Sequence, residues 1–236
     1  MKPFLSLVIP AYNEEARIGN SLQLAAAYLN QTMYKYEILI VDDGSIDNTI
    51  QAVSGKENVK VIAQPHNMGK GAAVKAGMLH AEGDICIFSD ADFSTPVYEI
   101  EKVIQSINLG ADVCIGNRAL DSQMIRKHQP FYREFMGKTF NKFVQLLVIN
   151  GISDTQCGFK GFTNQAAKDI FSKSKIPGFG FDVEILYIAK VLGLNIAQVP
   201  VEWYNDERST VDPVRDSLRM LKDLFIIKKL HADLRK

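Results

Sequence analysis

The segment that most constrains this chain is a short apolar run, residues 85–88, that stops at two aspartates, Asp90 and Asp92. Such a run before turn-forming residues is typical of a strand that is buried on both faces. Parallel sheets bind their ligands in the crevice beyond the carboxyl ends of their strands. With i, i+2 spacing, both carboxylates can reach one hard cation such as Mg2+ or Mn2+, which prefers oxygen ligands. A surface turn with two solvated aspartates is the other interpretation of this pattern.

Apolar runs and helical patterns alternate through the first half of the chain. This alternation predicts an α/β domain with a mainly parallel central sheet and right-handed crossovers. Asn13 is expected to cap the first helix, which runs to about Asn30. Strands are expected over residues 5–9, 36–41, 59–62, 85–88 and 113–116, and further helices over 72–81 and 97–109.

Polar residues gather at the ends of these elements. Four such places, residues 10–14, 42–45, 69–71 and 89–92, are expected to face one crevice. Lys70 lies between two glycines at a helix start, where the backbone can approach a phosphate and the lysine adds positive charge. A solvated lysine at a helix start explains the same residues equally well.

The pattern changes after residue 117. Residues 117–129 are polar and predict a loop, whereas residues 131–149 and 213–234 predict amphipathic helices. A turn-rich strand is expected over 154–162, a helix from about residue 180 and a strand over 196–201. Because no repeat or low-complexity linker interrupts the chain, we expect one domain over residues 1–236.

Composition argues against several classes of protein. The chain has 27 basic and 27 acidic residues and no net charge, so no nucleic-acid partner is expected. Its three cysteines are widely spaced and form no CxxC pair, which disfavours a disulfide framework and a zinc site. The chain starts without a signal-peptide pattern, and no apolar run is long enough to span a membrane. We therefore expect a cytoplasmic protein whose membrane contact, if any, is peripheral.

Three motifs, in this order, resemble the inverting glycosyltransferases of family 2. They are Asp90-Ala91-Asp92-Phe93-Ser94-Thr95-Pro96, Asp154-Thr155-Gln156-Cys157-Gly158-Phe159-Lys160 and Gly180-Phe181-Asp182-Val183-Glu184, the last followed by Val199-Pro200-Val201-Glu202-Trp203. The resemblance covers nearly the whole chain and is closer to the catalytic domains of dolichyl-phosphate glucosyl- and mannosyltransferases than to other members. It implies a single nucleotide-diphospho-sugar transferase domain of the Rossmann-like GT-A fold with a C-terminal amphipathic helix. Residues 1–116 would bind the nucleotide sugar, and residues 117–236 would bind the acceptor.

For the donor, the resemblance assigns the metal to Asp90 and Asp92. Mg2+ or Mn2+ there would stabilise the charge that grows on the diphosphate as the glycosidic bond breaks. Lys70 would add positive charge near the diphosphate, and Tyr12 is explained equally well as a core or rim aromatic without a ligand. The positions that match the donor site are Pro10, Ala11, Tyr12, Glu14, Asp42, Lys70, Asp90, Ala91 and Asp92.

The implied acceptor is a polyprenyl phosphate at a membrane surface. Arg118 and Arg133 match arginines that hold the acceptor phosphate in the mannosyltransferase relatives, and Arg126 is a weaker candidate. A phosphate is already an anion near neutral pH, so it needs a strong protein base less than a hydroxyl does. Asp154 and Asp182 are the acids most like a base or an acceptor-positioning group, although a helix N-cap role explains Asp182 as well.

Two features of the C-terminal part bear on a lipid acceptor. Thr210 stands where similar glucosyltransferases carry the lysine of a Gly-Ser-Lys-Leu stretch, with Arg208 close in sequence. The helix from Phe131 and the C-terminal segment can lie at a membrane interface, or they can cover the protein core. The basic residues that would face anionic headgroups are Lys222, Lys228, Lys229 and Arg235.

The leading hypothesis is metal-dependent transfer of a hexose, glucose from UDP-glucose, to polyprenyl or dolichyl phosphate with inversion. One alternative keeps the donor half but uses a hydroxyl acceptor on a glycan or small molecule, and another uses GDP-mannose. A pyrophosphorylase-type nucleotidyltransferase would need a Gly-rich basic loop where this chain has the acidic residues 10–15. A non-catalytic sugar-nucleotide sensor would not need both metal carboxylates and the acceptor arginines. The sequence does not indicate an oligomeric state.

Overall fold

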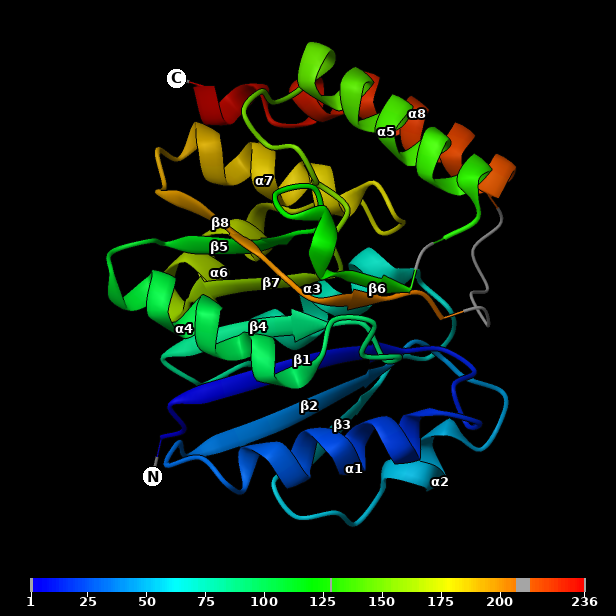
Figure 1. The fold of residues 1–236 in the computed structure, drawn as a ribbon, viewed down its shortest axis with the longest axis vertical. Coiled ribbons are helices and arrows are strands. Elements are labelled where there is room, and N and C mark those ends of the chain that lie inside the picture. The colour runs from blue at the N-terminus through cyan, green and yellow to red at the C-terminus, as the bar shows by residue number, and fades with distance from the viewer. Residues whose placement is uncertain (1, 128, 207–212, 236) are drawn as a thin grey trace.

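A seven-stranded sheet forms the centre of the molecule (Figure 1). The computed structural model describes residues 2–127, 129–206 and 213–235. The sheet has the order β3-β2-β1-β4-β7-β5-β8. Its strands are β1 (Leu5–Ala11), β2 (Tyr36–Asp42), β3 (Val59–Ala63), β4 (Ile85–Ser89), β5 (Val113–Asn117), β7 (Phe159–Thr163) and β8 (Ile196–Pro200).

The sheet is mostly parallel, as the alternation of elements predicts. The exception is β7, which pairs antiparallel with both β4 and β5. In this register Lys160 lies between Phe88 on β4 and Ile115 on β5. The strand in which the second motif ends therefore runs through the middle of the sheet, and its start lies beside the end of β4.

Helices cover both faces of the sheet. The helices on one face are α1 (Ile18–Leu29), α2 (Thr49–Val53) and α4 (Ile100–Asn108, after the 3-10 turn Val97–Glu99), and those on the other are α3 (Lys70–His80), α6 (Asn164–Lys173) and α7 (Phe181–Val191). Beyond α7, α5 (Phe131–Leu147) and α8 (Pro213–Leu230) pack against each other, and the 3-10 turn Ala232–Arg235 follows (Figure 1).

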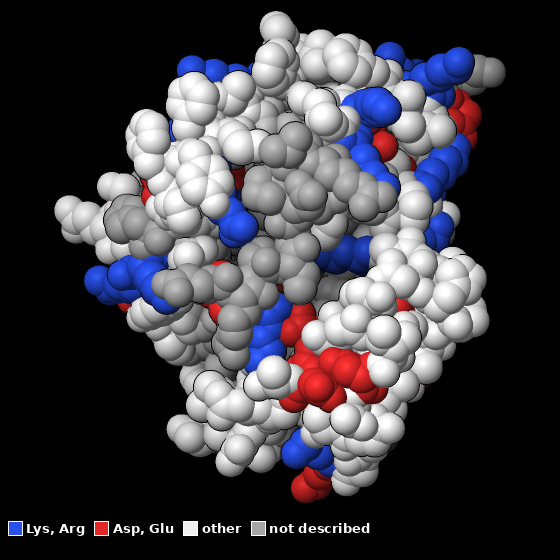
Figure 2. Space-filling view, turned by 90° about the vertical axis from the view of Figure 1, so that its right-hand side faces the viewer, with Lys and Arg blue, Asp and Glu red and all other residues white. Residues whose placement is uncertain are grey.

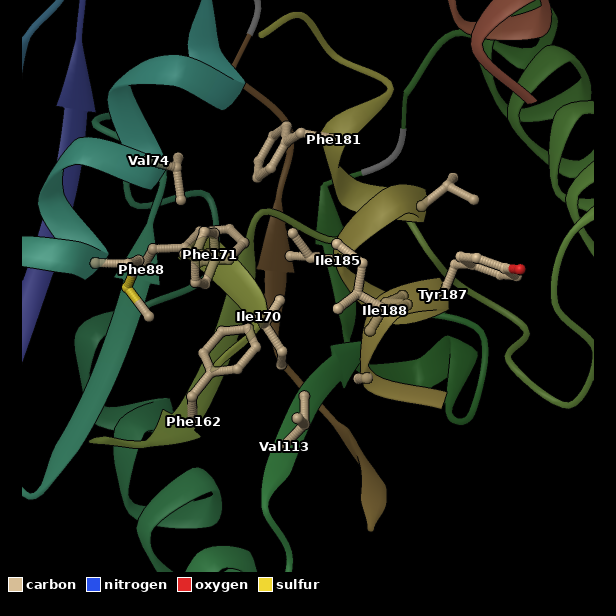
Figure 3. Packing of buried hydrophobic residues seen from close by; sticks show 14 of the residues in the cluster. Val74, Phe88, Val113, Phe162, Ile170, Phe171, Phe181, Ile185, Tyr187 and Ile188 are labelled. Atoms are coloured by element: carbon tan, nitrogen blue, oxygen red, sulfur yellow. The ribbon is translucent and has the colours of Figure 1, made fainter. Parts of the chain in front are cut away.

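Alternating strand residues divide the core between the two faces. Leu7 and Ile9 of β1 pack with α1 and α4, whereas Val8 packs with α3. On the α3 side, Phe88 lies against Phe181 with ring centroids 5.8 Å apart, and Phe162 meets Phe171 edge-on at 5.4 Å (Figure 3). Each buried aromatic side chain contributes about 1.5–3 kcal/mol through its removal from water. This packing fixes the position of α7 relative to β4.

Two local expectations differ from the structure. Helix α1 begins at Ile18, and Asn13 does not cap it. Asn13 instead has a φ of 54°, which asparagine tolerates better than most residues, and its side-chain oxygen accepts a hydrogen bond from the Ile46 N–H at 3.0 Å. The expected loop after residue 117 contains the 3-10 turn Ser122–Met124 and the strand β6 (Ile125–Lys127), which pairs with β9 (Trp203–Tyr204).

Two further expectations from composition can be compared with the structure. Cys86, Cys114 and Cys157 are all free and buried. Within residues 2–127, 129–206 and 213–235, no helix is long and apolar enough to cross a bilayer.

Candidate active site

The predicted site residues lie at the carboxyl edge of the parallel strands. Strands β1, β2 and β4 all end toward the right-hand side of Figure 1, and Figure 2 looks onto that side, where acidic and basic side chains lie next to one another. The parallel register brings Ala11 beside Asp42, so the loops after these two strands meet. The structure therefore brings together the strand ends that the sequence predicts to face one crevice.

Asp90 is held between a lysine and a glycine. Its Oδ1 forms an ion pair with Lys70 Nζ at 2.6 Å. A Cβ on Gly158 would overlap the Asp90 carboxylate, so this carboxylate lies directly against the backbone of the segment before β7. Burial lowers the pKa of Lys70, but the carboxylates of Asp90 and Asp182 outweigh burial and raise it above its ordinary value. Lys70 is therefore a permanent cation at this edge.

The loop before Lys70 is fixed by β2 and by glycine packing. Asp43 follows β2, and its carboxylate accepts hydrogen bonds from the N–H groups of Met68 at 2.8 Å and Gly69 at 2.9 Å. Gly69 has a φ of 103°, and a Cβ on Gly71 would lie 2.6 Å from the Ile176 carbonyl oxygen. Both glycines are thus required by the protein's own backbone geometry, which positions the start of α3.

Asp92 lies in a cluster around Arg17, which is not among the predicted site residues. The guanidinium binds the Glu14 carboxylate. Its Nη1 lies 3.1 Å from Asp206 Oδ2 and 3.8 Å from Asp92 Oδ2. Asp92 Oδ1 accepts the Ser94 N–H at 2.8 Å. Burial and then the charge of Asp90 raise the pKa of Asp92 above its ordinary value. The spacing of Glu14 and Arg17, three residues apart, is the sequence signal that could have indicated the first of these contacts.

The acidic pair fits a divalent cation that shares its coordination with a ligand. Asp90 and Asp92 provide hard oxygen donors. Burial and, after it, the charge of Asp90 raise the pKa of Asp92, and a bound cation would offset both effects. Among the described residues, no group of three or more His, Cys, Asp or Glu side chains could hold a metal without other ligands. Mg2+ is usually bound by one or two carboxylates together with substrate phosphates. The residues present therefore fit a cation that arrives with a phosphorylated substrate.

At the end of β2, the same edge of the sheet contains an unsatisfied acceptor. Asp42 is 1 % exposed, and its Oδ2 accepts the Ser45 N–H at 3.1 Å, whereas its Oδ1 has no hydrogen-bond partner among the described residues. A buried carboxylate oxygen without a donor costs free energy, so this position suits a ligand N–H. Ala11 is buried beside it, and Tyr12 is 39 % exposed. Pro10 is buried in β1, and Glu14 is bound by Arg17.

Asp154 and Arg118 form one unit. Arg118 donates to both oxygens of Asp154, at 2.7 Å from Nε and 2.9 Å from Nη2, and its guanidinium lies 5.3 Å from the Trp203 ring centroid. Burial raises the pKa of Asp154, but Arg118 outweighs this and lowers the pKa below its ordinary value. A carboxylate with a low pKa and both oxygens occupied is a poor base. The geometry favours a positioning role for Asp154.

Asp182 is paired with a buried lysine. It lies in the first turn of α7, whose N-cap is Gly180, so the N-cap explanation of Asp182 is wrong. Its Oδ1 accepts a hydrogen bond from Lys160 Nζ, and Lys160 is fully buried. Burial raises the pKa of Asp182 above its ordinary value even though Lys160 and Lys70 oppose this.

The remaining arginines differ in their surroundings. Arg133 lies in the first turn of α5, and its buried Nε has no hydrogen-bond partner among the residues that the structure describes. Arg126 is exposed on β6 and donates to Glu202 Oε1 at 2.7 Å. Arg126 is therefore engaged in a surface ion pair, whereas the Nε of Arg133 has no partner within the part of the chain that the structure describes. Thr210 and Arg208 lie outside the described residues.

Known proteins are similar to this chain in sequence and in fold. Residues 6–171 match the family model described as Glycosyl transferase family 2. A dolichyl-phosphate beta-glucosyltransferase of Dictyostelium discoideum is 39 % identical over 244 residues, and that of Homo sapiens is 35 % identical over 242 residues. Both alignments cover 95 % of this chain and 74 % of the relative.

Solved structures share the fold at lower identity. Glucosyl-3-phosphoglycerate synthase from Mycobacterium tuberculosis in complex with UDP has a TM-score of 0.71 and 19 % identity, and the match covers 98 % of this chain and 80 % of the other. The same synthase in complex with Mn2+, UDP-glucose and phosphoglyceric acid has a TM-score of 0.69 and 20 % identity, with 95 % and 79 % covered. These matches establish a GT-A-like arrangement of the central sheet.

Proposed function

Because this chain belongs to glycosyltransferase family 2, we propose that it transfers glucose from UDP-glucose to dolichyl phosphate or a similar polyprenyl phosphate. The observation that carries this proposal is the 35–39 % identity, over about 95 % of the chain, to dolichyl-phosphate beta-glucosyltransferases. In the reaction, an oxygen of the acceptor phosphate forms a bond to the anomeric carbon of glucose. The bond between that carbon and the diphosphate breaks, and UDP leaves with the electron pair.

The donor half of the site provides charge where UDP leaves. Asp90 and Asp92 would hold the divalent cation, which supplies electrophilic stabilisation of the departing diphosphate when it is bound. Lys70 is a permanent cation beside Asp90 and can bind the same diphosphate when the carboxylate turns to the metal. The unpartnered Oδ1 of Asp42 can accept an N–H of the base, with Ala11 and Tyr12 beside it.

The acceptor half provides cations and needs no strong base. Arg133 has a buried donor that no described residue binds and that can donate to a phosphate oxygen, and Arg118 is held by Asp154 and Trp203. A guanidinium fixed in this way loses little further freedom when it binds a phosphate. Asp154 then acts as the residue that orients Arg118. Arg126, which is bound to Glu202, is the weakest of the three proposed phosphate ligands.

A polyprenyl acceptor requires that the enzyme reach a membrane surface. Helices α5 and α8 expose large apolar side chains on the outside of the molecule, with Phe131 at 82 %, Leu146 at 79 % and Phe225 at 70 %. Exposed basic residues lie among them, including Lys138, Lys142 and Lys222. Apolar side chains surrounded by lysines are typical of helices that lie in the headgroup region of anionic membranes. We propose that this surface, the α5/α8 face, docks on the bilayer that contains the acceptor.

The test is a transfer assay with purified protein. UDP- and GDP-sugars are supplied with Mg2+ or Mn2+, with and without a short polyprenyl phosphate. Glucosyl lipid formed from UDP-glucose, and lost in Asp92→Ala, is the expected result. Transfer only to a hydroxyl compound, or from GDP-mannose, would replace the acceptor or donor named here.

A further inference from the structure

Lys160 is a fully buried cation in the middle of the sheet. It is 0 % exposed, and its Nζ donates to the Cys157 carbonyl oxygen at 2.6 Å and to Asp182 Oδ1. The same ammonium lies 5.3 Å from the Phe88 ring centroid. Lys160 thus joins three segments, namely the turn before β7, the end of β4 and the start of α7.

This ion pair is not explained by stability alone. Taking an ammonium and a carboxylate out of water is costly, and well-packed apolar residues in place of a buried pair are often as stable or more stable. The surroundings are apolar, because Phe88, Phe162 and Phe181 pack on this side of β4 and β7 (Figure 3). A pair retained in such a place calls for a role that needs its charges.

Asp182 lies within electrostatic reach of the donor site. The charges that act on its carboxylate are Lys160, Lys70 and Asp90, and the last two form the ion pair at the proposed diphosphate position. Only Oδ1 of Asp182 is bound by Lys160, and the side chain is 6 % exposed. A phosphate acceptor does not need Asp182 as a base, so an ionised carboxylate here has lone pairs for another partner. Next to the diphosphate of the donor, that partner is the hexose.

We propose that Lys160 is a positioning residue that keeps Asp182 ionised and oriented, and that Asp182 accepts hydrogen bonds from hydroxyl groups of the transferred hexose. This inference rests on the proposed function, because it presumes a nucleotide-sugar donor. It assigns sugar recognition to the strand β7 and helix α7, whereas the nucleotide is held by the loops after β1, β2 and β4. Lys160 acts through Asp182 and does not itself touch the sugar.

The test compares the affinities of two ligands that differ only in the sugar. Calorimetry measures the binding of UDP and of UDP-glucose, each with Mg2+, and the ratio of the two association constants isolates the hexose. In Asp182→Asn we expect this ratio to fall by about 10-fold or more, as for a lost hydrogen bond to a charged group, without a matching loss of UDP affinity. Lys160→Met should lower the ratio in the same direction. Lys168→Met is the control, because Lys168 Nζ donates to carbonyl oxygens at the end of α3, such as that of Ala81 at 2.9 Å.

A double variant separates function from folding. Each single substitution leaves one buried charge without its partner, which destabilises the protein. In Lys160→Met/Asp182→Asn both charges are absent, so we expect the thermal midpoint to recover toward that of the wild type while the affinity ratio stays low. Recovery of both quantities would mean that the pair has only a structural role and would overturn the proposal.

The pH dependence of the affinity ratio distinguishes the proposed role of the pair from a purely structural one. Protonation of Asp182 should lower the affinity ratio in the wild type. Lys160→Met should move this decrease to higher pH, because Lys160 then no longer offsets the effect of burial on the pKa of Asp182. The Lys70–Asp90 pair affects UDP and UDP-glucose alike and cancels in the ratio. An unchanged ratio in Asp182→Asn, or equal losses for UDP and UDP-glucose, would overturn the inference. Failure of the wild type to bind either ligand would instead overturn the proposed function.

Discussion

Gly158 has no side chain, and the position of the Asp90 carboxylate depends on this. In Gly158→Ala the new methyl group would overlap that carboxylate, which must move away from its ion pair with Lys70. A displacement of about 1 Å at a reacting centre can cost roughly 100-fold in rate. We therefore expect kcat/KM for glucosyl transfer to fall by about 100-fold, measured at saturating metal.

The matched control for Gly158 is Gly19 in α1. A Cβ there would meet nothing closer than the Ala52 carbonyl oxygen at 3.8 Å. Because alanine favours a helix more than glycine, Gly19→Ala should raise the free energy of unfolding by up to about 1 kcal/mol and leave transfer unchanged. Full activity in Gly158→Ala would show that Asp90 is not needed where the structure places it.

Because of the Asp154–Arg118 ion pair, we expect the free energy of unfolding to depend on pH. Side chains of the pair are 10 % and 26 % exposed, so removing one partner by Asp154→Asn should lower the free energy of unfolding by about 3–5 kcal/mol at neutral pH. The pKa of Asp154 in the folded state lies below its value in the unfolded chain, about 3.9. The contribution of the carboxylate to the free energy of unfolding is therefore complete above the pKa of the unfolded chain. It is lost as the pH falls through the pKa of the folded state.

Urea denaturation at several pH values measures this contribution. The difference between wild type and Asp154→Asn should be constant from pH 7 to about pH 5 and should shrink below about pH 4. Asp84→Asn is the control, because Lys2 and Asp84 form an ion pair whose side chains are 59 % and 58 % exposed and which solvent therefore screens. A difference that persists unchanged at pH 3 would mean that Asp154 is not ionised against Arg118 in the folded protein.

At the scale of residues, the sequence predicted the groups that follow strands. Asp42, Asp90 and Asp92 lie at the carboxyl edge because a strand must end before a turn, and that order is visible in the chain. Arg17 and Gly158 could not be placed in this way. Apart from the Glu14–Arg17 pair, which the spacing of these residues indicates, the contacts of Arg17 with Asp92 and Asp206 and of Gly158 with Asp90 join residues far apart in sequence. No local pattern encodes such contacts.

At the scale of elements, the alternating pattern predicted the layers but not the direction of every strand. Strand β7 follows a turn-rich segment and runs antiparallel between two parallel neighbours. Its residues have the same apolar character in either direction, so periodicity could not decide between them. The β6–β9 pairing was missed because both strands are very short.

The α5/α8 face yields a prediction about membrane binding. Phe131 and Phe135 are exposed, and their rings stack with centroids 6.4 Å apart at the start of α5. Serine at both positions should weaken binding to vesicles of anionic lipid, measured by co-sedimentation, with little change in stability because neither ring is buried. Met33→Ser is the control, because Met33 is 98 % exposed on the loop after α1. Equal vesicle binding by the double variant and the wild type would contradict the docking surface.

At the scale of the whole molecule, residues 1–116 and 117–236 pair within one sheet and also meet at the proposed donor site. Asp90 of the first half contacts Gly158 of the second, and Asp182 lies within reach of Lys70. A nucleotide sugar bound at this junction would contact both halves. Ligand binding should therefore stabilise the fold as one cooperative unit.

Thermal unfolding with UDP and Mn2+ tests this coupling and the metal role together. A ligand present at 100 times its Kd adds about 2.7 kcal/mol, which for a chain of this size corresponds to a rise of roughly 5–10 °C in Tm. Asp92→Asn can still accept the Ser94 N–H and relieves the repulsion from Asp90, so its Tm without ligand should stay near that of the wild type. Its rise with UDP and Mn2+ should be small, because one of the two proposed metal ligands has lost its charge. The same rise in both proteins would show that Asp92 does not hold the cation, whereas no rise in either would argue against UDP as the nucleotide.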